Sequence, residues 1–164
     1  MTNEIDTSKV RGRRALRFET LDDIVADVDR LAAAPQVRAL GNWSSGQVFQ
    51  HLANAMNNSI DGKVPKLPAA VRFLFRLFMK GRFLTKPMSP GFRLPKSAAM
   101  LLPAPTGFAE GLRNARAALV RLQTESGRAD HPAIGPLTRS EWDQLHCRHA
   151  ELHLSFLISG ERGA

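Results

Sequence analysis

Four segments of this 164-residue chain repeat apolar residues at helical spacing and carry signals for a helix start or stop. The first follows Thr20, a typical N-cap, and opens with aspartates that suit the positive end of a helix dipole. Capping boxes, in which a Ser or Thr is followed three residues later by a Glu or Gln, open the second and fourth segments. The predicted helices span about 21–34, 44–61, 106–126 and 138–158. No strand pattern competes with them, so the sequence predicts an all-α fold.

A long connection rich in Pro and Gly, residues 62–105, separates the second and third predicted helices. Within it, residues 69–80 are predicted to form a short basic helix. Four main helices with one long crossover are typical of a helical bundle. We therefore expect a basic N-terminal arm, residues 1–19, and a single bundle domain, residues 20–160. The chain has one cysteine and no visible secretory signal, so a cytoplasmic location is expected.

The net charge of +8 is unevenly distributed. Nine Lys or Arg and no Asp or Glu lie between residues 62 and 109, and a second basic cluster precedes the first helix. Such clusters favour an anionic partner, whether nucleic acid, a membrane surface or a small molecule with carboxylates, or they form solvated faces. No nucleic-acid motif is present, so no specific nucleic acid is expected. Basic residues interrupt the apolar stretch 69–84, so no transmembrane segment is expected either.

Three histidines form the strongest functional pattern. His149 and His153 stand at i, i+4, which places both imidazoles on one face of the fourth helix. His51 lies among apolar residues of the second helix and is therefore expected to point inward. Three imidazoles with an open fourth position are a catalytic layout for zinc, and nickel and iron accept the same ligands. The alternative is three core histidines that are satisfied by protein groups.

Two segments that contain these histidines resemble the DinB/YfiT-like superfamily. They are Asn-Trp-Ser-Ser-Gly-Gln-Val-Phe-Gln-His-Leu-Ala, 42–53, and His-Ala-Glu-Leu-His-Leu-Ser-Phe-Leu, 149–157. With His-Pro-Ala-Ile-Gly-Pro-Leu-Thr, 131–138, and Gly-Phe-Arg-Leu-Pro, 91–95, the chain looks most similar to an uncharacterised branch. The resemblance covers about residues 17–157. Many members carry a second adjacent His and a Gln where this chain has Leu154 and Phe156.

This resemblance implies an up-up-down-down four-helix bundle, a homodimer, and a divalent metal (Zn, Ni or Fe) held by His51, His149 and His153. Some members are transferases or isomerases that depend on a low-molecular-weight thiol. The leading hypothesis is therefore a metal-dependent enzyme that transfers such a thiol to a small-molecule substrate. A non-catalytic metal- or ligand-binding bundle is the second hypothesis, and a basic nucleic-acid or membrane-surface module is the third.

Four further residues are candidates around the site. His146 and His131 are candidates for proton transfer, although each is also explained as a structural histidine. Arg72 and Arg76, in the basic crossover helix, are candidates to hold the carboxylates of a thiol cofactor or an anionic substrate. For that helix we expect apolar side chains on the core and arginines toward solvent, with a membrane-surface helix as the alternative.

Overall fold

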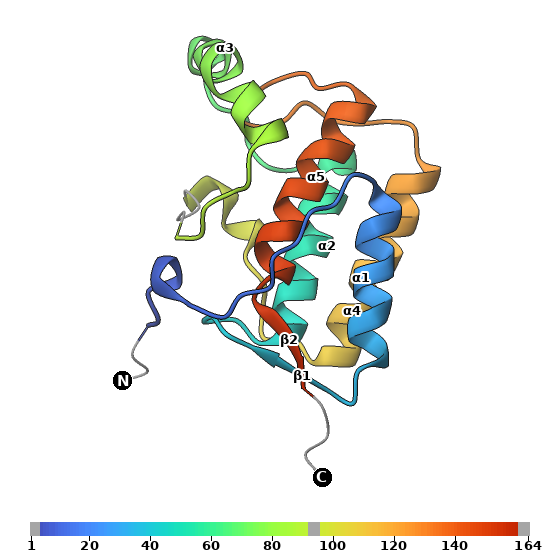
Figure 1. Ribbon diagram of the computed structural model, residues 1–164. Coiled ribbons are helices and arrows are strands. Elements are labelled where there is room, and N and C mark those ends of the chain that lie inside the picture. Colours follow the sequence, from blue (N-terminus) through green and yellow to red (C-terminus); the bar gives the residue numbers. More distant parts are fainter. Residues whose placement is uncertain (1–3, 92–95, 161–164) are drawn as a thin grey trace.

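A computed structural model describes residues 4–91 and 96–160, so most of the Gly-Phe-Arg-Leu-Pro motif lies outside the described residues. The described part is mostly helical and contains one small two-stranded sheet (Figure 1). In chain order its elements are the 3-10 helix η1 (Thr7–Lys9), α1 (Leu21–Ala33), β1 (Gln36–Ala39), α2 (Ser45–Asp61), α3 (Ala69–Thr85), the 3-10 helix η2 (Lys96–Leu101), α4 (Phe108–Thr124), α5 (Arg139–Leu154) and β2 (Leu157–Gly160).

The helix starts expected from the sequence are confirmed where a capping side chain marks them. Thr20, Ser44 and Thr138 each accept a hydrogen bond from the backbone N–H three residues later, and a return bond completes a capping box each time. Gly62 ends α2 in the left-handed conformation, which glycine adopts without strain. These starts were predictable because each capping box involves residues only three positions apart.

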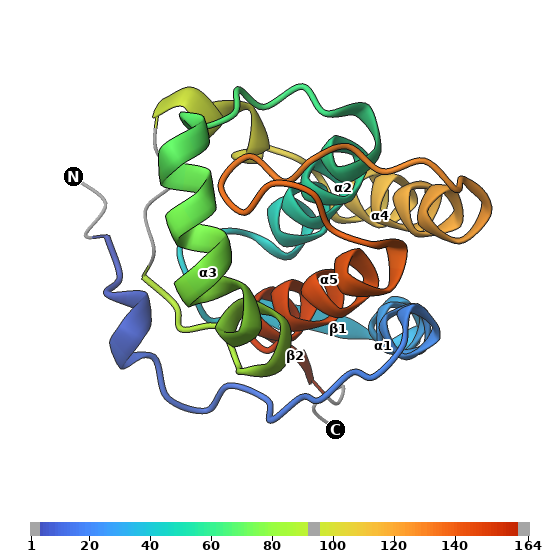
Figure 2. The ribbon, with the colours of Figure 1, turned by 90° about the horizontal axis from the view of Figure 1, so that it is seen from above.

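The main hydrophobic core lies between α1, α2, α4 and α5. Each helix contributes buried residues at helical spacing. They include Ile24, Val28 and Leu31 of α1; Val48, Phe49, Leu52 and Met56 of α2; Leu112, Leu119 and Leu122 of α4; and Cys147, Ala150 and Leu154 of α5. Viewed from above, α5 lies between α1, α2 and α3 (Figure 2). Because α5 has neighbours on several sides, it buries residues around most of its circumference, including Trp142 and Leu145 toward α3.

The directions of the core helices differ from the expected up-up-down-down order. Gln50 pairs with Asn114 and Asn57 with Arg121, a constant offset of 64 residues, so α2 and α4 are parallel. Asp22 pairs with Gln123 and Asp29 with Arg116, so α1 is antiparallel to α4. Helices α1 and α5 therefore run toward the sheet, and α2 and α4 run away from it (Figure 1). The reason is connection length, since an up-up-down-down order needs two long crossovers and this chain has one.

The expectation that the chain contains no strand is wrong. Strands β1 and β2 pair antiparallel, with Gln36 opposite Gly160 and Ala39 opposite Leu157. The fourth predicted helix consequently ends at Leu154 rather than near residue 158. Each strand has only four residues, and the two are separated by most of the chain, so no local pattern marks them.

The expected orientation of the crossover helix is also wrong. Helix α3 extends to Thr85, and its Phe73, Leu77 and Phe78 side chains are more than 60% exposed. Its basic side chains Arg72 and Lys80 instead form ion pairs with Asp130 and Glu141, on the body of the protein. These acidic partners lie about 60 residues further along the chain, and they turn the charged face of α3 inward.

The N-terminal arm packs along α1 and α5. Arg14 forms a two-pronged ion pair with Asp27, with both N–O distances 2.7 Å, and its backbone N–H donates to the Ser155 carbonyl. Phe18 is buried in the main core. The second half of the arm is therefore part of the folded unit. Among residues 4–91 and 96–160, no helix has the length and apolar character needed to cross a membrane.

Candidate metal centre

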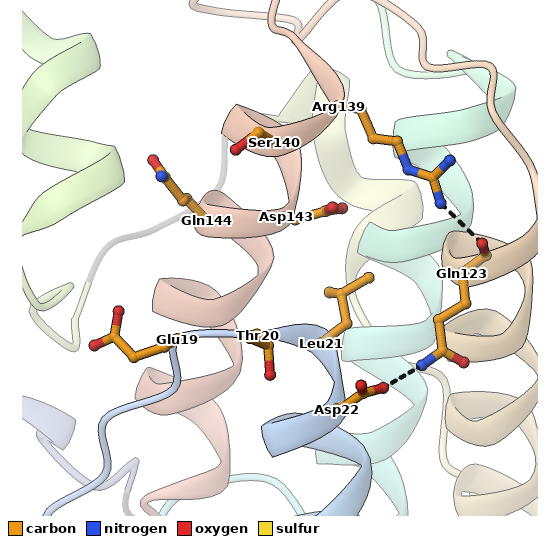
Figure 3. A pocket seen from close by; sticks show the side chains of 9 residues that line it. All are labelled: Glu19, Thr20, Leu21, Asp22, Gln123, Arg139, Ser140, Asp143 and Gln144. Atoms are coloured by element: carbon orange, nitrogen blue, oxygen red, sulfur yellow. Dashed lines mark hydrogen bonds between the residues drawn. The ribbon is translucent and has the colours of Figure 1, made fainter.

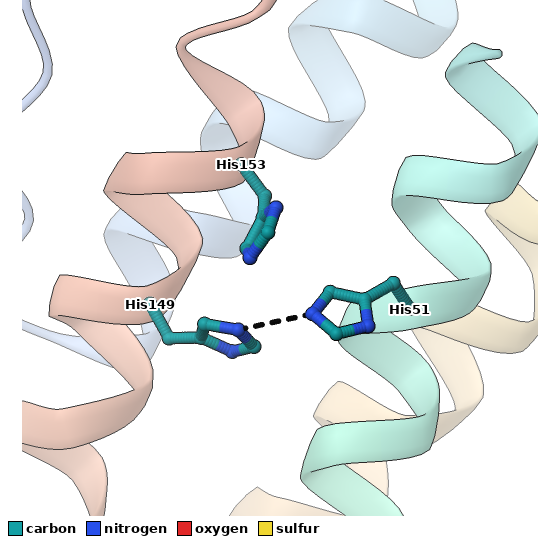
Figure 4. A group of neighbouring side chains, drawn as sticks. All are labelled: His51, His149 and His153. Carbon is teal, nitrogen blue, oxygen red and sulfur yellow. Dashed lines mark hydrogen bonds between the residues drawn. The ribbon is translucent and has the colours of Figure 1, made fainter. Parts of the chain in front are cut away.

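The three histidines singled out from the sequence lie together between α2 and α5 (Figure 4). One ring nitrogen from each of His51, His149 and His153 lies within 4.8 Å of the others. His149 and His153 lie one turn apart on α5 with their rings edge to face, and His51 faces them from α2. His51 is buried at 3% exposure, whereas His149 and His153 are partly exposed. This group could hold a metal ion.

A backbone carbonyl fixes the orientation of His51. The Leu101 carbonyl, at the end of η2, lies 2.7 Å from Nδ1 of His51, so Nδ1–H donates to it. The proton on Nδ1 leaves the lone pair of Nε2 directed at the other two histidines. Metal-binding histidines commonly have their second ring nitrogen held in this way. The crossover, through Leu101, therefore helps to prepare the site.

All three imidazoles are neutral at physiological pH. Burial is the largest cause that lowers the pKa of His51 below 6.5. Burial, followed by the neighbouring histidines, places the pKa of His149 well below 6.5, and burial followed by His51 and Arg13 does the same for His153. Because a metal binds the deprotonated imidazole, these shifts reduce competition from protons.

One pair of nitrogens, which are hydrogen-bonded to each other, has the spacing of two ligands on a tetrahedral ion. The Nε2 atoms of His51 and His149 are 3.2 Å apart. Two imidazole nitrogens at about 2.0–2.1 Å from a tetrahedral zinc are about 3.3 Å from each other. In the described part of the chain the ring nitrogens of His153 make no hydrogen bond to a protein group, so protein partners alone do not satisfy the cluster.

Trp43 forms one wall of the site. Its ring centroid lies 4.7 Å from that of His51 and 5.6 Å from that of His153, on which it stacks. The same tryptophan lines a surface pocket of about 420 Å³ formed by residues of 36–45. None of the three histidines lines this pocket, and Trp43 is the residue that contacts the cluster and also lines the pocket.

Residues 10–159 match the family described as "Protein of unknown function (DUF1569)". The chain belongs to this family. No curated protein and no solved structure matches it. The matched region contains all three histidines and their supporting residues, and the family description states no activity.

Arg13 is a site residue that the sequence did not single out beyond its membership of the basic arm. Its guanidinium donates to the Ser155 Oγ at 2.8 and 3.0 Å and lies 4.3 Å from the centre of the Phe156 ring. Its charge is close enough to His153 to contribute to the lowered pKa of that imidazole. A cation beside neutral ligands is suited to an anionic group, and only the packing of the arm brings it there.

His146 and His131 both have structural partners. Ser59 donates its hydroxyl proton to the Met56 carbonyl, so Nε2–H of His146 donates to Ser59 Oγ at 3.0 Å. Nδ1 of His131 accepts the backbone N–H groups of Ala133 and Ile134, both at 3.1 Å. Burial lowers the pKa of His146 to about 3 and that of His131 to about 4. Their role in proton transfer stays a prediction, and these contacts match the structural alternative.

The buried, neutral His146 makes the apoprotein sensitive to acid. Above pH 6.5 the imidazole is neutral in both the folded and the unfolded chain and has no effect on the pH dependence. Below pH 6.5 the unfolded chain binds a proton that the folded chain refuses until about pH 3, so stability falls as pH falls. Between pH 6.5 and 5 this one group lowers the free energy of unfolding by about 2 kcal/mol. Urea denaturation of metal-free protein across this range should show a shallower pH dependence for His146→Gln than for the unmodified chain, and an unchanged slope would contradict the assignment.

Arg72 and Arg76 are engaged with the loop that precedes α5. Arg72 pairs with Asp130 at 3.3 Å, and Arg76 donates to the Pro136 carbonyl. Both groups thus have protein partners, and their predicted role in holding an anionic cofactor stays a prediction. The sequence has two basic clusters, the N-terminal arm and the crossover. The arm, through Arg13, contributes the cation near the histidines.

A second pocket, of about 440 Å³, lies apart from the histidines between the ends of α1, α4 and α5 (Figure 3). Its lining is mostly polar and comprises Glu19, Thr20, Leu21, Asp22, Gln123, Arg139, Ser140, Asp143 and Gln144. Asp22 accepts a hydrogen bond from Gln123, and Arg139 donates to the Gln123 carbonyl. The residues that line this pocket include no histidine or cysteine, so it offers fewer of the ligands that zinc, nickel and iron prefer than the histidine cluster does.

Proposed function

We propose that this chain is a divalent-metal-binding protein in which His51, His149 and His153 are the protein ligands of zinc, nickel or iron. The convergence of three neutral imidazoles, two of them with Nε2 atoms 3.2 Å apart, is the observation that carries the proposal. The Leu101 carbonyl orients one ligand, and Trp43 shields the cluster on one side. Three protein ligands leave a position for an exogenous molecule.

We further propose that the chain is related to the DinB/YfiT-like superfamily, although its core helices do not follow the up-up-down-down order that the resemblance implied, and that the site serves a thiol-dependent transfer to a small electrophile. The resemblance in segments 42–53 and 149–157 supports this reaction class. A divalent metal supplies Lewis acidity that lowers the pKa of a bound thiol. The chain's own residues orient the ligands and place the Arg13 cation near His153, where it would hold a carboxylate of the thiol or substrate.

Metal uptake tests the first proposal. Protein purified without an affinity tag should bind one equivalent of Zn²⁺ per chain in a titration against a chromophoric chelator. His149→Ala, which removes the central ligand, should weaken binding by roughly 100-fold or more, because lost supporting contacts alone cost about 10- to 100-fold. His131→Asn is the matched control, since it removes a partly buried histidine outside the cluster and should retain one equivalent. Failure to take up Zn²⁺, Ni²⁺ or Fe²⁺ would leave three core histidines and end the proposal.

A thiol-binding experiment distinguishes the proposed thiol-dependent enzyme from a non-catalytic metal-binding bundle. The metal-loaded chain should bind a carboxylate-bearing thiol such as glutathione more tightly than it binds a neutral thiol of similar size. Arg13→Gln should remove that preference while leaving Zn²⁺ affinity within about threefold, because Arg13 is not a ligand. A metal-loaded protein that binds neither thiol is a non-catalytic metal-binding bundle, the second hypothesis.

A further inference from the structure

The outward side of α3 is an apolar surface that the described residues, 4–91 and 96–160, leave exposed. We define the α3 apolar face as Val71, Phe73, Leu74, Phe75, Leu77 and Phe78, each of which is at least 37% exposed. Phe73 and Phe78 are 65% and 71% exposed. Single exposed apolar residues are ordinary, but six on one face of one helix form a contiguous patch of the kind that marks an interaction site.

The orientation of α3 is held by polar contacts on its opposite side. Arg72 binds Asp130, Arg76 donates to the Pro136 carbonyl, and Lys80 pairs with Glu141. Leu84, near its C-terminal end, is buried against Trp142 and Leu145. Helix α3 lies at the edge of the molecule, against α5 and the loop before it (Figures 1 and 2). Turning the helix over would break all three polar contacts, so the apolar face is fixed outward.

The charge around this face identifies its partner. Residues 62–109 contain nine Lys or Arg and no Asp or Glu, and four of these cations pair with acidic side chains of other segments: Lys63, Lys66, Arg72 and Lys80. Arg82 and Lys86, at the end of α3, are exposed. A helix with Phe and Leu on one face and basic residues beside it is the pattern of a helix that lies in the interface of an anionic bilayer. A second copy of this chain would bring two basic segments together, and the resulting repulsion opposes self-association through α3.

We propose that α3 docks this protein on the surface of an anionic phospholipid bilayer. The α3 apolar face enters the boundary between headgroups and acyl chains, and Arg82 and Lys86 lie at the level of the lipid phosphates. The helix lies along the surface and does not cross it, in agreement with its 17 residues and four basic side chains. This docking is independent of metal binding at the histidines.

Vesicle co-sedimentation of the full chain tests the proposal. The unmodified protein should bind vesicles of phosphatidylcholine that contain roughly 30% phosphatidylserine, and it should bind pure phosphatidylcholine vesicles much more weakly. Binding to the anionic vesicles should weaken as the salt concentration rises. Phe73→Ser with Phe78→Ser should weaken binding by about 30-fold or more, because two phenylalanines no longer leave water. Val120→Ser, at a 56% exposed apolar residue of α4, is the matched control and should bind as the unmodified chain does.

Three results would overturn the proposal. The first is no binding to the anionic vesicles, and the second is equal binding to neutral and anionic ones. The third is a dimer in sedimentation velocity that the double serine variant converts to monomer, which would assign the face to a second copy of the chain. Because both serines replace exposed side chains, the variant should keep the circular dichroism and melting temperature of the unmodified protein, and this check separates lost docking from lost folding.

Discussion

Replacing Gly111 by alanine is expected to lower the free energy of unfolding by about 3 kcal/mol or more, because no space exists for a methyl group at the crossing of α2 and α4. A Cβ at Gly111 would overlap the Gly46 carbonyl oxygen and lie 2.9 Å from its carbon. A Cβ at Gly46 would likewise meet the backbone of Thr106 and Gly107. The obstructing atoms are backbone atoms, so no side-chain rotation relieves the overlap.

The loss of stability expected for Gly111→Ala should exceed the gain that alanine brings through its higher helix propensity. Alanine is favoured over glycine within a helix by about 1 kcal/mol. Gly81, in α3, has nothing within 4 Å of its Cβ position, so Gly81→Ala should raise stability by roughly that amount. In urea denaturation, a lower free energy of unfolding for Gly111→Ala together with a higher one for Gly81→Ala would verify the close approach of α2 and α4. Equal stability of Gly111→Ala and the unmodified chain would contradict it.

The crossing also matters for the histidine cluster. Gly46 lies in the first turn of α2, and His51 follows little more than one turn later. A displacement of α2 away from α4 would therefore move His51 relative to His149. We expect the Gly111→Ala variant to bind Zn²⁺ more weakly, whereas Gly81→Ala should bind as the unmodified chain does.

Removing the buried Arg148 is the second change with a large expected effect. Its guanidinium lies 3.0 Å from Glu151 and donates to the Phe18 carbonyl, while Glu151 accepts the Phe18 backbone N–H at 2.6 Å. The Arg148 and Glu151 side chains are 3% and 6% exposed. Arg148→Met leaves the Glu151 carboxylate buried without its cation, which costs about 3–5 kcal/mol.

The pH dependence of the free energy of unfolding distinguishes a buried Glu151 carboxylate without its cation from a simple loss of packing at Arg148. Burial raises the pKa of Glu151 above 4.5 even with Arg148 present. Because a neighbouring cation favours the charged carboxylate, removal of Arg148 is expected to raise this pKa further. The folded variant then holds a proton that the unfolded chain releases above about pH 4.5, so the stability of Arg148→Met should fall as pH rises. A double variant, Arg148→Met with Glu151→Leu, should recover much of the loss because no charge is left buried.

A surface ion pair provides the matched control. Arg116 and Asp29 lie 2.6 Å apart, but their side chains are 48% and 54% exposed. Arg116→Met should change the free energy of unfolding by less than about 1 kcal/mol, as is usual for exposed pairs. A similar cost for Arg116→Met and Arg148→Met, both measured by denaturant titration, would contradict the role assigned to burial.

The N-terminal arm gives the Arg148 network a functional consequence. Phe18 is the anchor that Arg148 and Glu151 hold, and Arg13 lies five residues before it in the same arm. Loosening this anchor should free Arg13 from its place near His153. The preference for a carboxylate-bearing thiol is therefore expected to weaken in Arg148→Met, in parallel with stability.

The sequence alone determined the core helices and the histidine cluster. The N-cap at Thr20 and the capping boxes at Ser44 and Thr138 involve residues three positions apart, and His149 and His153 share a face because a helical turn requires it. An inward His51 on a second apolar helix face was enough to predict that the three imidazoles meet. Each of these inferences depends on spacing within one helix, which local sequence encodes.

Tertiary structure decided what depends on contacts between distant segments. Strand β1 forms only because β2, more than a hundred residues later, pairs with it. Helix α3 presents its apolar face outward because Asp130 and Glu141 hold its basic side chains. Ser155 and Phe156 hold Arg13 where its charge acts on His153. A helical pattern shows that a segment has two faces, but the partners that select one face for the interior are supplied by the rest of the chain.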